Sequence, residues 1–213
     1  MLRFNAEVLW AALRSVAYAA SKDESRAHLA AMHFARVGEQ VRLTCTDGHW
    51  LARWLVSPLE SSEDGPLTAL FHIGDILDSL RQIKRNKLGT CDVHLENGAV
   101  WLSNGVRFTW RPVLAEFPPV DKVMPRFTGA EAPIRYLGFS PHLMRQAVRV
   151  FPKEATVRAQ FMGLTEQIYM TTDTIEGLEV VLMPARVDEP TEADAKKRSK
   201  KSRKTETADA TAE

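Results

Sequence analysis

The sequence predicts an α+β protein built from one unit, a strand followed by a helix and three strands, that repeats about three times along the chain. Segments with apolar residues at helical spacing recur, and each is followed by short segments in which apolar and polar residues alternate. Residue pairs that favour tight turns separate these short segments. The similarity between copies is slight, so the repetition lies in the order of the elements. Such repetition suggests an assembly with pseudo-symmetry.

The first unit begins with a predicted helix over 5–20, for which Asn5 is a suitable N-cap. Its apolar residues recur at helical spacing: Val8, Leu9, Ala12, Leu13, Val16 and Ala20. Three strands are expected after it, over 28–37, 40–46 and 49–57. Gly38-Glu39 and Asp47-Gly48 are the turns between them. The polar segment 58–66 is expected to be a loop.

The second unit repeats this order. A strand is expected over 67–72 and a helix over 73–85, with Ile76, Leu77, Leu80 and Ile83 on one face. Three further strands are expected at 90–96, 99–103 and 106–111. Asn97-Gly98 and Asn104-Gly105 separate them, and both pairs favour hairpin turns because their residues tolerate positive φ.

A proline-rich connector, 116–133, leads to the third unit. This unit is expected to contain a strand (134–139), a helix (141–151) and strands at 155–162, 166–171 and 178–183. The helix should turn Leu143, Met144, Ala147 and Val148 inward. The remaining segment, 188–213, is polar and charged, so we expect it to be disordered.

The composition limits the function classes. No apolar run approaches the ~20 residues that span a bilayer, and the N-terminus lacks the pattern of a secretory signal. Cys45 and Cys91 form no CxxC pair, so a reducing cytoplasm is the expected location. The net charge of +1 argues neither for nor against nucleic acid, so the placement of charges must decide.

Three motifs resemble one family in the family's own order. TDGHWLA (46–52), FPPVDKVMP (117–125) and VVLMPARV (180–187) are similar to segments of the bacterial DNA polymerase III beta sliding clamp. The resemblance implies the DNA-clamp (processivity) fold, with helices lining a ring and sheets outside. It also implies that 1–125 corresponds to the family's middle domain, and 126–187 to the second half of its last domain. The first domain of the family has no counterpart here.

The resemblance implies a function without catalysis or cofactor. A ring of clamp units encircles duplex DNA without reading its sequence, and it tethers a polymerase, a clamp loader or a repair factor through short peptide motifs. Rings of this family and its relatives contain twelve units, so three units per chain predict a homo-oligomer of four chains. The expected location is the cytoplasm, at the nucleoid.

Basic residues on or just beyond the predicted helices are the expected DNA contacts. They are Arg14, Lys22, Arg26, Arg81, Lys84, Arg85, Lys87, Arg145, Arg149 and Lys153. Arg145 and Arg149 are four apart and share a helix face, whereas Asp75 and Asp78 dilute the second cluster. The alternative is that these residues only form solvated helix faces.

The resemblance also implies a peptide pocket between the two clamp domains. Its expected wall is Leu29, Thr46, Gly48, His49, Trp50, Leu51, Pro118, Val123, Val181, Met183 and Pro184, with Arg26 at the edge. An apolar cleft with a few polar groups suits a peptide anchor. Trp50 stands where the family has arginine, and Ala185 where it has a second methionine, so the partner's motif can differ. The alternative for Val181 and Leu51 is ordinary core.

The sequence also contains residues that could suggest other functions. Asp47 and His49 could form an acid/base pair or bind a metal, but no further residues with ligand spacing accompany them, so hairpin geometry is the favoured interpretation. No P-loop, dinucleotide fingerprint or nucleophile elbow is present. A clamp-like protein that forms no ring and regulates clamp partners is the main alternative, followed by an enzyme acting on nucleic acid. The basic run 196–204 could serve as a linker, a DNA tether or a partner site.

Overall fold

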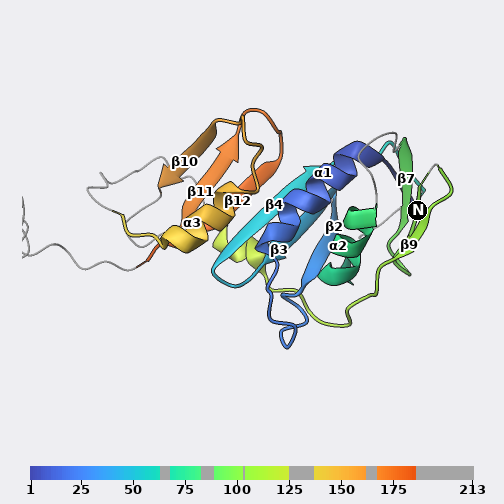
Figure 1. Ribbon diagram of the computed structural model, residues 1–213, viewed down its shortest axis with the longest axis horizontal. Coiled ribbons are helices and arrows are strands. Elements are labelled where there is room, and N and C mark those ends of the chain that lie inside the picture. Colours follow the sequence, from blue (N-terminus) through green and yellow to red (C-terminus); the bar gives the residue numbers. More distant parts are fainter. Residues whose placement is uncertain (63–67, 83–88, 103, 125–136, 162–166, 186–213) are drawn as a thin grey trace, which may run out of the picture.

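The computed structural model describes residues 1–62, 68–82, 89–102, 104–124, 137–161 and 167–185, and Figure 1 shows their helices and strands. The predicted end of the second helix (83–85), part of the third unit's first strand (134–136) and the tail (188–213) lie outside the described residues. The predicted α+β fold is confirmed: in the described part of the chain, three α-helices accompany two antiparallel sheets.

The first unit contains β1 (Leu2–Asn5), α1 (Ala6–Val16), β2 (Ala31–Val37), β3 (Gln40–Thr46) and β4 (Trp50–Val56). Asn5 caps α1 as predicted, because its side chain accepts hydrogen bonds from the backbone N–H groups of Glu7 and Val8. One 3-10 turn, η1 (Ala17–Ala19), continues the helix. Two short strands were not predicted, β1 and β5 (Glu60–Ser61), and they pair with each other.

The second unit contains β6 (Thr68–His72), α2 (Ile73–Gln82), β7 (Thr90–His94), β8 (Ala99–Leu102) and β9 (Arg107–Thr109). The chain then turns back along β6: the His72 N–H donates to the Arg111 carbonyl, and the Val113 N–H donates to the Leu70 carbonyl. The connector that follows includes the 3-10 helix η2 (Val120–Val123).

The third unit contains α3 (Pro141–Val148), β10 (Val157–Phe161), β11 (Ile168–Thr172) and β12 (Leu178–Leu182). Ser140 caps α3 through a hydrogen bond from the Leu143 N–H. The helix is shorter than predicted, and Val148 is not inward: 42% of it is exposed. Because the helix ends there, Val150 and Phe151 enter the core instead.

The first two units exchange their first strands. β1 pairs with β7 of the second unit, whereas β6 pairs with β2 of the first. The five-stranded sheet therefore has the order β5-β1-β7-β8-β9, and the seven-stranded sheet has the order β10-β11-β12-β4-β3-β2-β6. This reciprocal exchange ties the two units into one body.

The core lies between the helices and the sheets. Phe34, Phe71 and Trp110 are fully buried at its centre, with ring centroids 5.4–5.8 Å apart. The Trp110 indole N–H donates to the Ser79 hydroxyl, so its polar atom is satisfied. Gly98 has φ +67°, and a Cβ built there would lie 2.0 Å from the Trp110 carbonyl oxygen. Only glycine fits this close approach.

The third unit joins the first edge to edge. β12 pairs antiparallel with β4, from Leu178 opposite Trp54 to Leu182 opposite Trp50. The helices follow one another in the order α3, α1, α2 on the same side of the sheets in Figure 1. One face of the molecule is therefore helical, and the other is formed by the sheets and the connector.

Candidate functional site

The helical face carries an arginine at the same distance from the start of each helix; in α1 and α2 it lies in the last turn, and in α3 it is the C-cap residue. Counted from the residue that precedes each helix (Asn5, His72 and Ser140), the ninth residue is Arg14, Arg81 and Arg149. All three are exposed. Helical periodicity alone does not reveal this correspondence, whereas an alignment of the three helix starts in the sequence does.

The position of these arginines follows from helix geometry. Ala12, Ser79 and Ala147 occur two residues earlier in the three helices, and each is almost completely buried against the sheets. A step of two residues turns about 200° around the helix axis. The arginines therefore point away from the sheets, into the space in front of the helical face.

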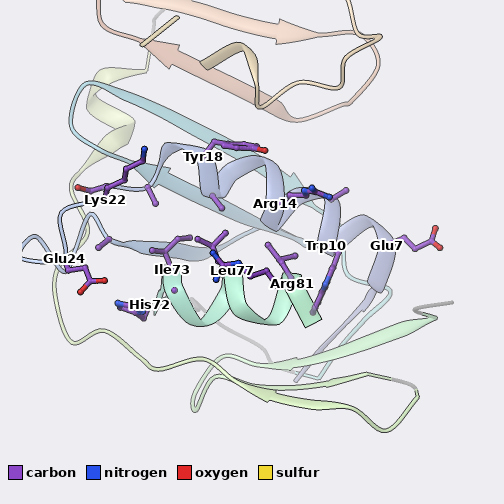
Figure 2. A pocket seen from close by; sticks show the side chains of 17 residues that line it. Glu7, Trp10, Arg14, Tyr18, Lys22, Glu24, His72, Ile73, Leu77 and Arg81 are labelled. Atoms are coloured by element: carbon purple, nitrogen blue, oxygen red, sulfur yellow. The ribbon is translucent and has the colours of Figure 1, made fainter. Parts of the chain in front are cut away.

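A groove of about 970 Å³ runs between α1 and α2 on this face. Figure 2 shows side chains of both helices along it, including Arg14 and Lys22 from the first unit and Arg81 from the second. Glu7 and Glu24 also line it, so the groove is basic but not uniformly so. Arg81 pairs with Asp78 at 2.7 Å, with both side chains largely exposed. Exposed pairs of this kind contribute little to stability and leave the arginine accessible.

The other predicted DNA contacts are placed as follows. Arg145 and Lys153 are exposed on and after α3. Arg26 is exposed but lies beside the β3–β4 turn, where it donates to the Asp47 carbonyl oxygen at 3.4 Å and pairs with Asp23. Lys84, Arg85 and Lys87 lie outside the described residues.

The opposite face carries a separate apolar cluster at the β4–β12 junction. Leu51, Val120, Tyr169 and Val181 are buried there, with Phe117 and Met124 packed against them. Leu51 and Val181 are direct partners in the strand pairing. The connector thus docks on the sheet where the third unit joins the first. Sequence reasoning missed Phe117, Val120 and Tyr169 as members of this cluster.

Charged groups hold the connector over the same junction. Arg42 donates two hydrogen bonds to the Asp121 carboxylate, at 2.9 and 3.0 Å. Arg53 bridges Asp121 and Glu179, and Glu179 also accepts a hydrogen bond from the Tyr169 hydroxyl. Burial and this bond raise the pKa of Tyr169. The phenol therefore stays a donor at neutral pH.

A histidine completes the docking of the connector. The His33 ring stacks on Phe117, with centroids 4.6 Å apart and planes at 17°, and its Nε2 lies 2.7 Å from the Thr68 hydroxyl. Burial, with a smaller contribution from Arg42, lowers the pKa of His33. The neutral imidazole is therefore the favoured form at neutral pH.

The predicted hairpin ends at the edge of this cluster. The Asp47 carboxylate accepts the backbone N–H groups of His49 and Trp50, at 2.8 and 3.1 Å. Gly48, with φ +93°, makes the turn. The Met183 N–H donates to the His49 carbonyl at 3.1 Å, which extends the β4–β12 pairing. Asp47 is thus used in the turn, and His49 is exposed beside it.

Most residues of the predicted pocket surround this junction. Met183 is 41% exposed, and Gly48, His49 and Val123 are also exposed. Pro118 and Pro184 are half-buried, whereas the rest are buried: Leu29, Thr46, Leu51 and Val181.

Trp50 is a correction to the predicted pocket wall. Only 2% of it is exposed, and it belongs to the main core. Successive residues of a strand point to opposite faces, so Trp50 shares the core side of β4 with Ala52 and Trp54, whereas Leu51 faces the connector. Trp50 therefore does not line the pocket.

Other chemistry has little support among the residues that the structure describes. No three His, Cys, Asp or Glu side chains gather there in a way that could hold a metal ion. Cys45 and Cys91 are free and buried, and burial raises the pKa of the Cys91 thiol to about 12. No helix in the described part of the chain is long and apolar enough to cross a membrane.

Comparison with known proteins identifies the fold. No protein-family model matches the sequence, and no curated protein matches it. The fold is similar to that of the DNA polymerase III beta subunit from Thermotoga maritima, at a TM-score of 0.71 and 17% identity, covering 88% of this chain and 66% of that one. The Bacillus subtilis sliding clamp gives 0.73 at 15%, covering 88% and 64%. The Pseudomonas aeruginosa beta subunit gives 0.69 at 18%, covering 88% and 66%.

The chain spans just under two thirds of the length of each of these proteins. At such identities the likeness is one of fold, which agrees with the repeated units and the exchanged first strands described above. The resemblance carried by the three motifs is therefore confirmed for the fold: the chain has the fold of the bacterial DNA polymerase III beta sliding clamps over just under two thirds of their length.

Proposed function

We propose that this protein is a non-enzymatic DNA sliding clamp, in which several copies close a ring around duplex DNA and hold a partner protein on it. The observation that carries the proposal is the arginine at the same distance from the start of all three helices, on one face of a clamp fold. Such a protein would act in the cytoplasm, at the nucleoid.

The chemistry of the helical face suits DNA phosphates. Arg14, Arg81 and Arg149 sit on separate helices, and each can meet the backbone of a duplex that passes in front of the face. Contacts to phosphates fix position without reading bases. A ring that relies on them can slide, because one register on the duplex is equivalent to the next.

The partner would bind at the β4–β12 junction. The proposed pocket keeps the expected residues except Trp50: Met183 and His49 are exposed at the junction, whereas Leu51 and Val181 are buried in the cluster on which the connector packs. Met183 is flexible and polarizable, which suits a site that accepts several peptides. The proposed division, residues 1–125 and 126–187, puts this pocket at the boundary between two clamp domains.

Retention on closed DNA tests the ring directly. The protein is incubated with a nicked circular plasmid, and gel filtration in about 0.3 M salt, where free electrostatic binding is weak, then separates bound from free protein. We expect retention on the circle and loss after one restriction cut, because a ring slides off the ends. Equal retention on circular and linear DNA would contradict encirclement. If loading needs a loader, the host's clamp loader and ATP are added to both samples.

The second candidate is a regulator that binds clamp partners without forming a ring. A monomer by native mass spectrometry that still binds a clamp-binding peptide would support this candidate and contradict the first.

A further inference from the structure

The first strand of each of the first two units lies between two partners. β1 has β5 on one edge, with Leu2 opposite Ser61, and β7 of the other unit on its second edge. β6 is arranged in the same way: Phe71 is bridged to Pro112 from the end of its own unit, and β2 of the other unit lies on the second edge. Each unit therefore offers its first strand to a paired unit and receives one in return.

In the described part of the third unit, the segment before the helix has a partner from its own unit but none from another unit. Gly138, in the segment 137–139 before α3, is bridged to Ala185 from the end of its own unit. Within the described residues, neither the second edge of this segment nor the outer edge of β10 has a strand partner. These two edges correspond to the edges that β1 and β7, or β6 and β2, use to pair.

The side chains near these edges are exposed where their counterparts are buried. Val148 is the eighth residue after its helix cap and is 42% exposed, whereas Leu13 at the same position of α1 is completely buried. Phe139 and Phe161 are 45% and 43% exposed. Within the described residues, one apolar flank of the third unit therefore lacks the second helix and strand that cover the corresponding flanks of the first two units.

The sides of β10 show which of its residues would lie under a partner. Ala159 and Phe161 pair with Met170 and Ile168, both of which are buried in the main core. Cross-strand neighbours lie on the same side of a sheet. The exposed Ala159 and Phe161 therefore lie on the core side, at the edge where that core ends.

We propose that the third units of two copies pair around a two-fold axis, so that residues 137–139 of each copy add to β10 of the other. The occupant is a second copy of this chain because both complementary edges, one that gives a strand and one that receives it, occur in the same unit. Phe4, the residue before the α1 cap, pairs with Cys91, which lies 19 residues after His72. The same register puts Phe139 of one copy, the residue before Ser140, beside Ala159 of the other, which lies 19 residues after Ser140. The inference rests on the proposed ring for its purpose, although it concerns one interface only.

The proposal fixes how a ring would close. At one end of the folded molecule lie the unpaired edges of residues 137–139 and β10 in the third unit. At the other end lies β9, the last strand of the second unit. β9 corresponds to β4 and β12, which pair with each other. Each end of the molecule would therefore pair with the same end of another copy, so that neighbouring copies run in alternating directions around the ring. Such contacts are isologous, so the ring contains an even number of chains, and four is the number expected for twelve units.

Charge on the exposed flank tests the interface. We expect analytical ultracentrifugation to show the wild-type chain as dimers or larger assemblies. The double variant Val148→Asp with Ala159→Asp should halve the mass of the assembly or reduce it further. The control is Val37→Asp with Leu59→Asp, at exposed apolar positions of the first unit, which should leave the mass unchanged. A monomeric wild type, or an assembly that the flank variant does not alter, overturns the proposal. Circular dichroism checks that the variants are folded.

A disulfide tests the strand pairing even if the charged variant fails to fold. The double variant Phe139→Cys with Ala159→Cys should give a cross-linked dimer on a non-reducing gel, whereas Phe139→Cys with Gln160→Cys, on opposite sides of the sheet, should not. Equal cross-linking of both pairs, or of neither, overturns the exchange. A cross-linked dimer that is not retained on circular DNA contradicts only the ring, and retention without the cross-link contradicts only the exchange.

Discussion

Removing the arginine from all three helices should weaken DNA binding and, above all, its dependence on salt. The variant is Arg14→Ala, Arg81→Ala and Arg149→Ala, all at exposed positions. Each arginine that neutralises a phosphate releases a counterion, so the slope of log K against log salt falls by about 0.9 per contact. Three contacts per copy give a loss of about 2.7 in slope, which is roughly a 40-fold difference in affinity across a fourfold change in salt.

Fluorescence anisotropy of a labelled duplex over a salt series measures this slope. The matched control is Arg107→Ala, Lys122→Ala and Arg158→Ala, which removes the same charge from exposed residues of the sheets and the connector. We expect the slope of the control to differ from that of the wild type by less than about 0.9, the value for one phosphate contact. Equal slopes for the helix variant and the control would refute the assignment of the helical face, because the effect would then come from net charge alone.

Three further predictions follow from the fold and the outer face. Gly98→Ala should lower the free energy of unfolding by roughly 2–4 kcal/mol, from backbone strain and the contact with Trp110, whereas Gly38→Ala, with φ +61° and open space, should lose only about 1 kcal/mol in the same urea titration. Because burial lowers the pKa of His33 from its ordinary value of 6.5, the unfolded chain takes up this proton first. Stability should therefore fall as the pH drops below 6.5, and His33→Gln should reduce that fall in denaturation curves at several pH values. Met183→Ala should weaken a clamp-binding peptide roughly tenfold in isothermal titration calorimetry while the urea midpoint stays unchanged, and an unchanged affinity would remove Met183 from the pocket.

Local pattern predicted much of the fold. The helix start at Asn5 and the hairpin strands β2, β3 and β4 agree with the structure to within a few residues, because capping and alternation are local properties of the chain. β1 was missed, since four residues carry too little alternation and their partner β7 lies far along the sequence. Strand exchange between units is a tertiary effect, and no local pattern encodes it.

Two residues show why the candidate site was harder to predict. Trp50 was assigned to the pocket with its neighbours in the motif, although its alternation with Ala52 and Trp54 indicates the core side of β4. Val148 was expected to face inward from its helical spacing, and its spacing is indeed that of Leu13. Its exposure depends on whether a second helix lies beside it, which periodicity within one helix cannot state.

The two proposed surfaces share one strand, and this determines which variants can separate them. On β4, Trp50 and Ala52 pack beneath the helices, whereas Leu51 and Arg53 support the connector and the proposed pocket. A change that moves the β4 backbone should therefore affect DNA binding and peptide binding together. Exposed side chains on either face are separated from each other by the sheet and its core, and distant sites of this kind usually act additively. A helix arginine variant should therefore keep peptide affinity, and a variant at Met183 should keep the salt slope. Loss of both functions from either surface change would mean that the faces are coupled through β4, and that neither phenotype reports its own site.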